Sequence, residues 1–538
     1  MIRRRDFVKS SLLGAATLAS PLARTVFAGG EPAADTKYGK VRGTFTDGVY
    51  IFKGIHYGAS TEGSARFIPP QPPKPWSDVF NAQQYGDMAP QNLSAAVGSD
   101  IRVAMGDIFG PGKVSEDCLV LNVWTPGIAR GKRPVMVWLH GGGYTGGSDG
   151  APTYDGTHLA HKQDVVVVGI NHRLNVFGYL YLGKLSEKYA DSGNVGMLDC
   201  VLALEWVRDN IAHFGGDPAN VTIFGESGGG GKVSVLMAMP PAKGLFHKAI
   251  VESGSTLRVS TVEEGDAVAR KFLAQLKISA DRVDDLQKVP MDDILAAMRA
   301  MTGPNSIRLG PVVDGRSLPR QPFDPDAPAQ SANIPMLIGT NGTESTALLG
   351  IADSSLFSLD EATMHAKLKS YLRLTDDAPL DSLVAVYRKA QPNASPSDLY
   401  FAITTDRMMR MNAITQAERK AAQNAAPAYM YIFDWRSPVL GGKLGSPHGI
   451  ELAFVFDNTD KTTGMNGTGA DLVPLAEKVS AAWATFARTG KPDHSGLPPW
   501  PAYDTKTRAT MVFNDECKIV GDPGRDQRLA ITALPTTT

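Results

Sequence analysis

A serine set among small residues is the first candidate for chemistry in this chain. Residues 225–229 read Gly-Glu-Ser-Gly-Gly and match Gly-x-Ser-x-Gly, in which the glycines allow a sharp turn that exposes the serine hydroxyl. The pattern occurs again at residues 146–150, around Ser148. Only Ser227 follows an apolar run, 221–224, and precedes a helical stretch, as such a turn requires. Ser227 is therefore the predicted nucleophile, and Ser148 is interpreted as part of a glycine-rich loop.

A serine hydroxyl needs a general base, and several histidines follow Ser227 in the chain. His448 lies in a loop after the apolar run 429–433 and is the preferred base. His247 follows the serine too closely to leave room for an intervening acid strand, and His494 lies in a polar turn. His365 falls within a helical stretch. The sequence therefore favours His448.

The base in turn needs a carboxylate that orients it. Glu344 follows the apolar run 334–339, whereas Asp314 has the surroundings of a turn aspartate. The order serine, acid, histidine, each after a strand, favours Glu344 over Asp314. The competing interpretation for either carboxylate is a helix cap or a turn former.

Three consecutive glycines follow another apolar run. Residues 140–143 read His-Gly-Gly-Gly directly after 134–139. Acyl transfer passes through a negatively charged oxygen, which fixed backbone N–H groups stabilise. The predicted donors of this oxyanion hole are the N–H groups of Gly142, Gly143 and Gly228.

The elements that must position these residues alternate between strands and helices. The strand-like runs are apolar without alternation, as in strands covered on both faces, and this predicts an α/β fold with a mainly parallel central sheet and flanking and capping helices. The predicted strands are 134–139, 164–170, 221–224, 334–339 and 429–433. The predicted helices are 199–214 and about 232–239, with largely helical segments at 263–302 and 359–426.

Composition narrows the class of protein. The 538 residues are 43% hydrophobic and 20% charged, with 54 Lys and Arg against 55 Asp and Glu, which excludes a disordered chain and gives no reason to expect a nucleic-acid partner. Three cysteines, Cys118, Cys200 and Cys517, are too few for a disulfide scaffold. No metal or organic cofactor is expected, because the zinc motif His-Glu-x-x-His is missing and His158 and His161 are interpreted as surface residues.

The N-terminus resembles a bacterial export signal. Arg4-Arg5 in a basic stretch, an apolar small-residue run 10–20 and the small-residue site at Ala28 are typical of the twin-arginine class. Residues 1–28 are predicted to be this signal and 29–538 a single domain, which carries a net charge of −5. The protein is then periplasmic or secreted, with no stable membrane anchor. The alternative is a basic N-terminus of a cytoplasmic protein.

The chain from about 39 to 511 resembles the type-B carboxylesterase and cholinesterase family of α/β-hydrolases. Four motifs carry the resemblance: Phe-Lys-Gly-Ile at 52–55, Ser-Glu-Asp-Cys-Leu-Val-Leu-Asn-Val at 115–123, Gly-Asn-Val-Gly-Met-Leu-Asp at 193–199, and residues 221–229. The resemblance implies the α/β-hydrolase fold, a bacterial exported member and the same triad and oxyanion donors. In this family alanine usually follows the nucleophile, so Gly228 predicts a looser loop.

The resemblance also bears on the cysteines and on function. Animal members pair the cysteine at the position of Cys118 with one upstream that this chain lacks, so we expect free, buried thiols.

The resemblance implies a serine hydrolase that cleaves small to medium carboxylic esters through an acyl-enzyme. Two alternatives remain open, a non-catalytic binding protein on the same fold and an amide or lactone hydrolase with the same triad. The sequence leaves the oligomeric state open.

Overall fold

The computed structural model describes residues 31–92, 100–106, 110, 112–128 and 131–534. The chain divides into two units, Met1–Glu31 and Pro32–Thr538, and the description concerns the second. The predicted export signal, residues 1–28, lies outside the described residues. Within the described part of the chain, no helix has the length and apolar character needed to cross a bilayer.

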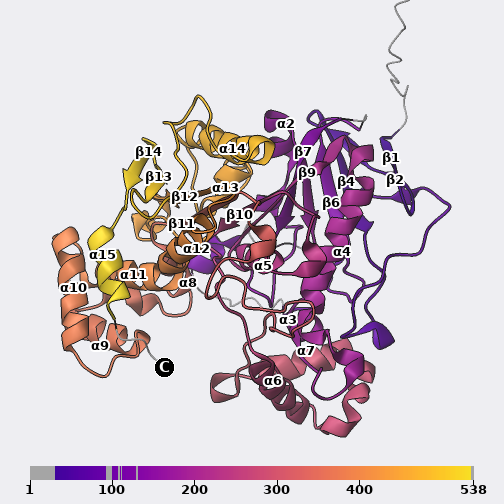
Figure 1. Cartoon of the computed structure of the whole chain (residues 1–538), viewed down its shortest axis with the longest axis horizontal. Coiled ribbons are helices and arrows are strands. Elements are labelled where there is room, and N and C mark those ends of the chain that lie inside the picture. Colours follow the sequence, from indigo (N-terminus) through magenta and orange to yellow (C-terminus); the bar gives the residue numbers. More distant parts are fainter. Residues whose placement is uncertain (1–30, 93–99, 107–109, 111, 129–130, 535–538) are drawn as a thin grey trace, which may run out of the picture. The chain divides into compact units, whose positions relative to one another are not determined.

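An eleven-stranded sheet forms the centre of the fold (Figure 1). The strands from β8 to β13 pair in parallel and those at both edges pair antiparallel, which confirms the predicted mainly parallel sheet. In spatial order the strands are β14 (Lys518–Gly521), β13 (Ala509–Phe513), β12 (Ala428–Phe433), β11 (Met336–Asn341), β10 (Lys248–Glu252), β9 (Gly216–Glu226), β7 (Arg133–Leu139), β8 (Val166–Ile170), β6 (Val120–Thr125), β4 (Val49–His56) and β3 (Thr44–Thr46). A smaller sheet consists of β1 (Ala33–Thr36), β2 (Gly39–Arg42) and β5 (Phe80–Asn81).

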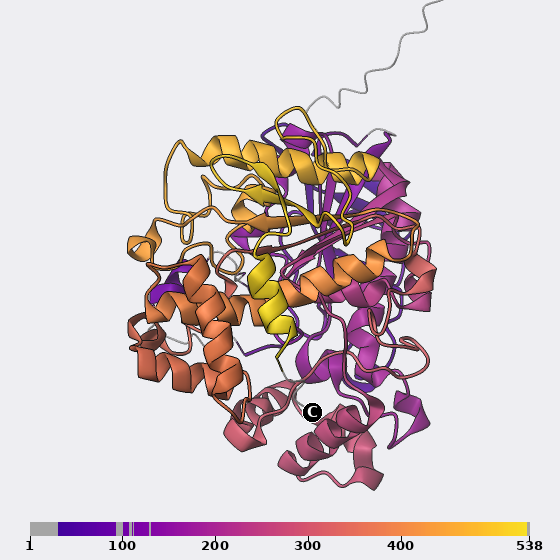
Figure 2. The ribbon, with the colours of Figure 1, turned by 60° about the vertical axis from the view of Figure 1, so that its left-hand side comes forward.

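Both faces of the large sheet are covered by helices, as the unbroken apolar strands require. In β7, Val135 and Val137 join the apolar cluster on one face, whereas Met136 and Trp138 join that on the other. The first face packs against α4 (Val195–Asn210), α5 (Gly228–Leu236) and α12 (Met411–Ala421), and the second against α2 (Thr157–Gln163), α13 (Leu452–Val455) and α14 (Leu472–Thr489). Figure 2 shows strands between the gold helix α14 and the orange helix α12.

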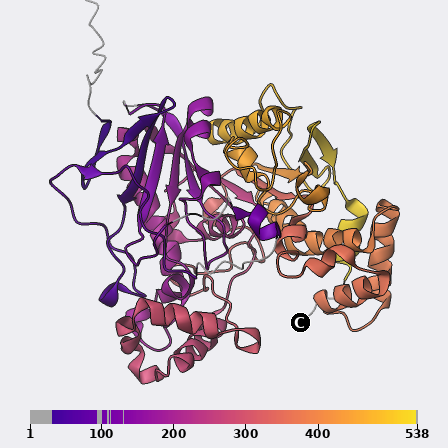
Figure 3. The same cartoon turned by 180° about the vertical axis from the view of Figure 1, so that it is seen from behind.

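Further helices extend from the sheet in two separate groups, which Figures 1 and 3 show from opposite sides. One group is α6 (Val262–Gln275) and α7 (Met291–Ala300). The other is α9 (Glu361–Tyr371), α10 (Ala378–Ala390), α11 (Pro396–Thr405) and α15 (Arg525–Thr532), which share a third apolar cluster of their own. Three short helices, α1 (Asp100–Ala104), α3 (Asn175–Tyr179) and α8 (Glu344–Leu348), lie in loops. These groups confirm the predicted helical segments.

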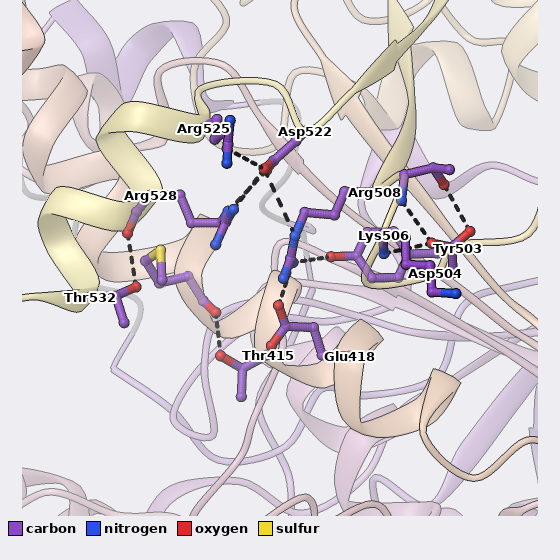
Figure 4. A network of polar contacts seen from close by, with 12 residues as sticks. Thr415, Glu418, Tyr503, Asp504, Lys506, Arg508, Asp522, Arg525, Arg528 and Thr532 are labelled. Atoms are coloured by element: carbon purple, nitrogen blue, oxygen red, sulfur yellow. Dashed lines mark hydrogen bonds and ion pairs between the residues drawn. The ribbon is translucent and has the colours of Figure 1, made fainter.

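The helix α15 is attached to the edge of the sheet by a polar network (Figure 4). Asp522, which follows β14, accepts hydrogen bonds from Arg528 Nη2 at 2.6 Å and Nε at 2.9 Å. Arg508, which precedes β13, donates to the Tyr503 hydroxyl at 2.8 Å and pairs with Glu418 of α12. The network thus joins the last helix to both the strand pair β13–β14 and a helix that covers the sheet.

Element boundaries differ from prediction around the glycines. Helix α4 begins at Val195 rather than 199, and β9 begins at Gly216, within the segment expected only to end the preceding helix. Helix α5 begins at Gly228 rather than about 232. Glycine disfavours helices by only about 1 kcal/mol per residue, so the packing of α5 against β9 and β10 overrides its propensity.

One buried ion pair joins helix α4 to the loop after β8. Arg173 and Asp199 are almost fully buried, and the guanidinium donates to both carboxylate oxygens, at 2.9 Å from Nε and 2.6 Å from Nη2. The backbone N–H of Arg173 also donates to Asp199 at 2.9 Å, and Arg173 Nη1 donates to the Ile68 carbonyl at 2.9 Å. Each charge is therefore compensated only as long as both partners are present.

Removing one partner of this pair is expected to destabilise the protein strongly. Asp199→Ala leaves the Arg173 guanidinium buried without its counter-charge, which lowers the free energy of unfolding by about 3–5 kcal/mol. Urea-induced unfolding followed by tryptophan fluorescence measures the change. The control is Asp284→Ala, since Asp284 pairs with Lys188 at the surface with 64% of its side chain exposed, and we expect a much smaller loss there. Equal losses in the two variants would contradict the prediction.

Candidate active site

Ser227 occupies a strained one-residue turn between β9 and α5. Its φ of 55° and ψ of −121° lie in a region that residues with side chains rarely adopt. Its backbone N–H donates to the Glu252 carbonyl of β10 at 2.8 Å, which holds the turn against the sheet. A Cβ on Gly229 would lie 1.9 Å from the Leu139 carbonyl oxygen. The turn is thus the sharp strand-to-helix turn that the sequence pattern predicts.

Gly228 lies against the glycine loop that follows β7. A Cβ at this position would lie 2.1 Å from the carbonyl oxygen of Gly143, so the alanine usual in the family does not fit without movement of that loop. Glycine at this position allows the two backbones to approach more closely than any other residue would.

His448 and Glu344 form a short, buried pair. The imidazole Nδ1 lies 2.6 Å from Glu344 Oε2, and the two residues are 4% and 0% exposed. The other carboxylate oxygen, Oε1, accepts hydrogen bonds from the Ser253 hydroxyl at 2.6 Å and from the backbone N–H of Asn341 at 2.7 Å. Because Glu344 begins helix α8 directly after β11, the sheet places it beside the loop of His448. The structure brings the preferred base and acid together.

The second imidazole nitrogen faces a carboxylate that the sequence reasoning missed. His448 Nε2 lies 3.1 Å from Oε1 of Glu226, the residue before the nucleophile. Among the described residues no hydrogen bond joins Nε2 to Ser227, a contact that in unliganded enzymes is often loose. Burial alone would lower the pKa of His448, but Glu226 and Glu344 outweigh it and raise that pKa above its ordinary value. The only sequence signal for Glu226 is its place inside the serine motif.

Two more buried glutamates surround this pair. Glu451 accepts from Asn341 Nδ2 at 2.5 Å, and Glu252 accepts from Trp483 Nε1 at 2.9 Å. Burial raises the pKa of Glu252 to about 8 and that of Glu451 well above its ordinary value. Their positions in apolar stretches gave no functional signal, because Glu252 reaches the site through the pairing of β10 with β9 and Glu451 through the loop that precedes α13.

Two backbone N–H groups of the glycine loop after β7, those of Gly142 and Gly143, can donate to a bound oxyanion. Gly142 and Gly143 have positive φ angles of 86° and 63°, and the Gly142 carbonyl accepts from Gly146 N–H at 3.1 Å. Within the described residues the N–H groups of Gly142 and Gly143 donate to no protein acceptor. Gly228 N–H opens helix α5, where the first N–H groups have no intrahelical acceptor. The loop therefore has the donors that an oxyanion requires.

The competing candidates lie in other surroundings. Asp314 caps a turn, with its carboxylate accepting from the backbone N–H of Leu318 at 2.9 Å and from the hydroxyl of Ser317 at 2.6 Å. Ser148 is buried, and its hydroxyl lies 3.3 Å from the side-chain oxygen of Asn171. Both therefore have structural roles.

The other histidines bind backbone or surface groups. His247 Nδ1 accepts from a backbone N–H of β9 at 3.1 Å, and His494 Nε2 lies 3.0 Å from a carbonyl of α14. His365 Nε2 lies 2.8 Å from Asp381 between α9 and α10. His158 Nδ1 lies 2.8 Å from the Asp457 carbonyl and is half-buried. None of these contacts involves Ser227 or Glu344.

The cysteines carry free thiols. Cys118 and Cys200 are buried as expected, whereas Cys517 is half-buried, since it lies beside the edge strand β14. In the part of the chain that the structure describes, no group of three or more His, Cys, Asp or Glu side chains could hold a metal ion.

Known proteins share this architecture along nearly the whole chain. The model of the carboxylesterase family matches residues 30–531. The para-nitrobenzyl esterase of Bacillus subtilis (strain 168) is 38% identical over 500 residues, which are 92% of this chain and 97% of that protein. The liver carboxylesterase of Sus scrofa is 36% identical, with 88% of each chain covered.

Solved structures agree with the sequence relatives. A carboxylesterase of Geobacillus stearothermophilus superposes with a TM-score of 0.80 at 37% identity, covering 93% of this chain and 99% of that one. An esterase from Clostridium hathewayi, described as hydrolysing aliphatic aromatic polyesters, has a TM-score of 0.77 at 31% identity and covers 94% of this chain and 98% of its own. With its α/β-hydrolase fold, the chain belongs to the carboxylesterase family and is a serine-type carboxylic-ester hydrolase.

Proposed function

We propose that Ser227, His448 and Glu344 are the catalytic triad of this ester hydrolase. The observation that carries the proposal is the buried 2.6 Å contact between His448 Nδ1 and Glu344 Oε2, next to a serine held in a strained turn. The carboxylate fixes the imidazole with its proton on Nδ1, which leaves Nε2 as the basic nitrogen. Oε1 of Glu344 is already occupied by Ser253 and Asn341, so the acid has one orientation.

The reaction proceeds in two acyl transfers. His448 Nε2 takes the proton of Ser227 Oγ as the oxygen attacks the ester carbonyl carbon, and the carbonyl electrons move to its oxygen. The N–H groups of Gly142, Gly143 and Gly228 stabilise that oxyanion. The alcohol leaves with the proton from His448, and a water molecule activated by His448 then releases the acid and restores Ser227.

The proposed substrates are small to medium carboxylic esters. The names of the relatives include a para-nitrobenzyl esterase and a phenmedipham hydrolase, so 4-nitrobenzyl and 4-nitrophenyl esters are suitable probes. The competing amide activity is tested by a 4-nitroanilide with the same acyl group, and we expect the ester to be the faster substrate. A non-catalytic binding role predicts that neither compound is cleaved.

Residues 1–28 are proposed to export the folded enzyme through a twin-arginine route, with cleavage after Ala28. The support is the basic segment with Arg4 and Arg5, the short apolar run and the small residue at the cleavage position. The enzyme would then act in the periplasm or outside the cell.

Ser227→Ala is expected to abolish ester hydrolysis. Loss of the nucleophile removes the acyl-enzyme route, so kcat on a short-chain 4-nitrophenyl ester falls by at least about 10⁴-fold. The matched control is Ser148→Ala in the second Gly-x-Ser-x-Gly segment, which leaves kcat nearly unchanged because Ser148 only supports its loop. Circular dichroism establishes that both variants fold. A folded Ser148→Ala that loses activity, or an active Ser227→Ala, would place the nucleophile elsewhere.

Replacing Glu226 by glutamine is expected to shift the acid limb of the pH profile to lower pH. Hydrolysis needs the neutral imidazole, so kcat/KM rises as the pH passes the pKa of His448. Glu226→Gln removes a negative charge 3.1 Å from Nε2 that favours the imidazolium, so the pKa of His448 falls and the limb moves down by about one pH unit.

The control for this shift is Glu252→Gln. Its carboxyl lies in the same buried group but accepts from Trp483 Nε1 at 2.9 Å and has no contact with His448, so its replacement should move the limb much less. An acid limb that stays in place in Glu226→Gln, or that moves to higher pH, would refute the proposed effect of the Glu226 charge on the pKa of His448.

Export is expected to depend on the arginine pair. A double variant with Arg4→Lys and Arg5→Lys keeps the positive charge but breaks the pair, and we expect the uncleaved protein to remain in the cytoplasm of a bacterial host. Cell fractionation and mass measurement of the N-terminus report the outcome. Arg3→Lys, outside the pair, serves as control and should be exported and cleaved as the parent chain is. Equal export of the two variants would reject the twin-arginine route.

A further inference from the structure

A fully buried lysine lies directly behind the proposed oxyanion loop. Lys232 stands in α5, five residues after Ser227, and its side chain has no solvent exposure. Lysine is rarely buried to this extent unless it is paired with a carboxylate. Here the Nζ group donates instead to two backbone carbonyl oxygens, those of His140 at 3.0 Å and Gly143 at 2.9 Å. No carboxylate among the described residues forms an ion pair with it.

With these two contacts, every backbone carbonyl oxygen from His140 to Gly143 has a hydrogen-bond donor. The Gly141 carbonyl lies 2.9 Å from the imidazole Nδ1 of His140, and the Gly142 carbonyl accepts from Gly146 N–H at 3.1 Å. In a trans peptide the carbonyl of one residue points opposite to the N–H of the next residue. The held carbonyls of Gly141 and Gly142 therefore set the directions of the Gly142 and Gly143 N–H groups, and Lys232 holds the peptide on either side of these two. Because glycine has few steric limits on its backbone angles, a peptide plane between glycines can flip unless hydrogen bonds hold its carbonyl.

The surroundings allow the lysine to keep its charge. The imidazoles of His140 and His172 stack nearby with centroids 4.8 Å apart, and burial together with the charge of Lys232 lowers the pKa of His140 to about 3. Both rings are therefore neutral. Burial lowers the pKa of Lys232 to about 8, although Cys200 and Glu226 oppose this shift, so the ammonium form predominates at neutral pH. The Tyr144 ring, 5.5 Å from Nζ, also faces the charge.

We propose that Lys232 is a positioning residue for ester hydrolysis, whose ammonium fixes the His140 and Gly143 carbonyls at the two ends of the glycine loop, so that the two peptides between them keep the N–H groups of Gly142 and Gly143 aimed at the oxyanion. This inference rests on the proposed triad and oxyanion hole. The ammonium also places a positive charge behind the loop, in a region of low polarity where it favours the negative transition state over the neutral ester. Lys232 itself does not touch the substrate.

The test compares Lys232→Met with a matched variant elsewhere. Methionine has nearly the same length but neither charge nor N–H donors. The control is Lys420→Met, because Lys420 in α12 is equally buried and its Nζ also donates to two carbonyl oxygens, those of Ser331 and Ala332, while burial lowers its pKa to about 8. We expect Lys232→Met to lower kcat on a 4-nitrophenyl ester by about 100-fold with KM little changed, and Lys420→Met to leave kcat as it is.

A transition-state analogue separates positioning from a merely structural role. A trifluoromethyl ketone accepts Ser227 Oγ at its carbonyl carbon, gives the Oγ proton to His448 and leaves an oxyanion in the hole. Its affinity should fall in Lys232→Met by the same factor as kcat/KM, while a phosphonate that titrates the serine counts intact sites. Lys232→Gln, which retains N–H donors without the charge, should have a kcat between those of the parent and Lys232→Met, and it serves as the test variant if Lys232→Met does not fold.

Several outcomes would overturn the inference. They are an unchanged kcat in folded Lys232→Met or Lys232→Gln, a fall in kcat without a matching loss of ketone affinity, and equal losses in Lys232→Met and Lys420→Met. Failure of the inference remains distinct from failure of the proposed site. If Ser227→Ala is inactive while Lys232→Met keeps full activity, only the role of Lys232 is wrong, whereas an active Ser227→Ala would refute the triad itself.

Discussion

The backbone contact between the start of α5 and the end of β7 is the constraint on which the rest of the site depends. Added side chains at Gly228 and Gly229 would meet the carbonyl oxygens of Gly143 and Leu139 at 2.1 and 1.9 Å, so only glycine allows this approach. Because of this contact the chain turns from β9 into α5 at a single residue, Ser227. Its unusual backbone angles expose the hydroxyl. It also brings the N–H of Gly228 beside the glycine loop, so that nucleophile and oxyanion donors share one location.

Around this contact the protein concentrates ionisable groups where water is excluded. Burial penalises each charge, and the penalty is offset by partners from neighbouring elements: Glu344 has His448, Asn341 and Ser253, and Lys232 has two backbone carbonyls. Low polarity strengthens every electrostatic interaction at such a site. The same burial that costs stability therefore makes fixed dipoles and charges effective on a developing oxyanion.

The sheet positions the site residues, and the peripheral helices pack around it. Strands β7, β9, β10 and β11 are covered on both faces and place the site residues at their carboxyl ends, as parallel sheets commonly do. The helices α9, α10, α11 and α15 pack on a cluster of their own and reach the sheet through polar contacts such as those of Asp522 and Arg508. Helix α11 also contacts the site itself, because Ser345, next to Glu344 in α8, donates from its hydroxyl to the Phe401 carbonyl at 2.9 Å.

The sequence by itself determined the parallel strands, the helical excursions, the turn at Ser227 and the candidates Glu344 and His448, because these rest on local patterns of apolar residues and glycines. It misplaced the start of α5, since local propensity counts against a helix of glycines, and it missed Glu226, Glu252, Glu451 and Lys232. Glu252 and Glu451 lie in apolar stretches, Glu226 has no signal beyond its place in the serine motif, and Lys232 follows a run of glycines. Their meeting around His448 and the oxyanion loop was decided only by the tertiary structure, because strand register and helix packing join segments more than 100 residues apart, such as Glu344 and His448.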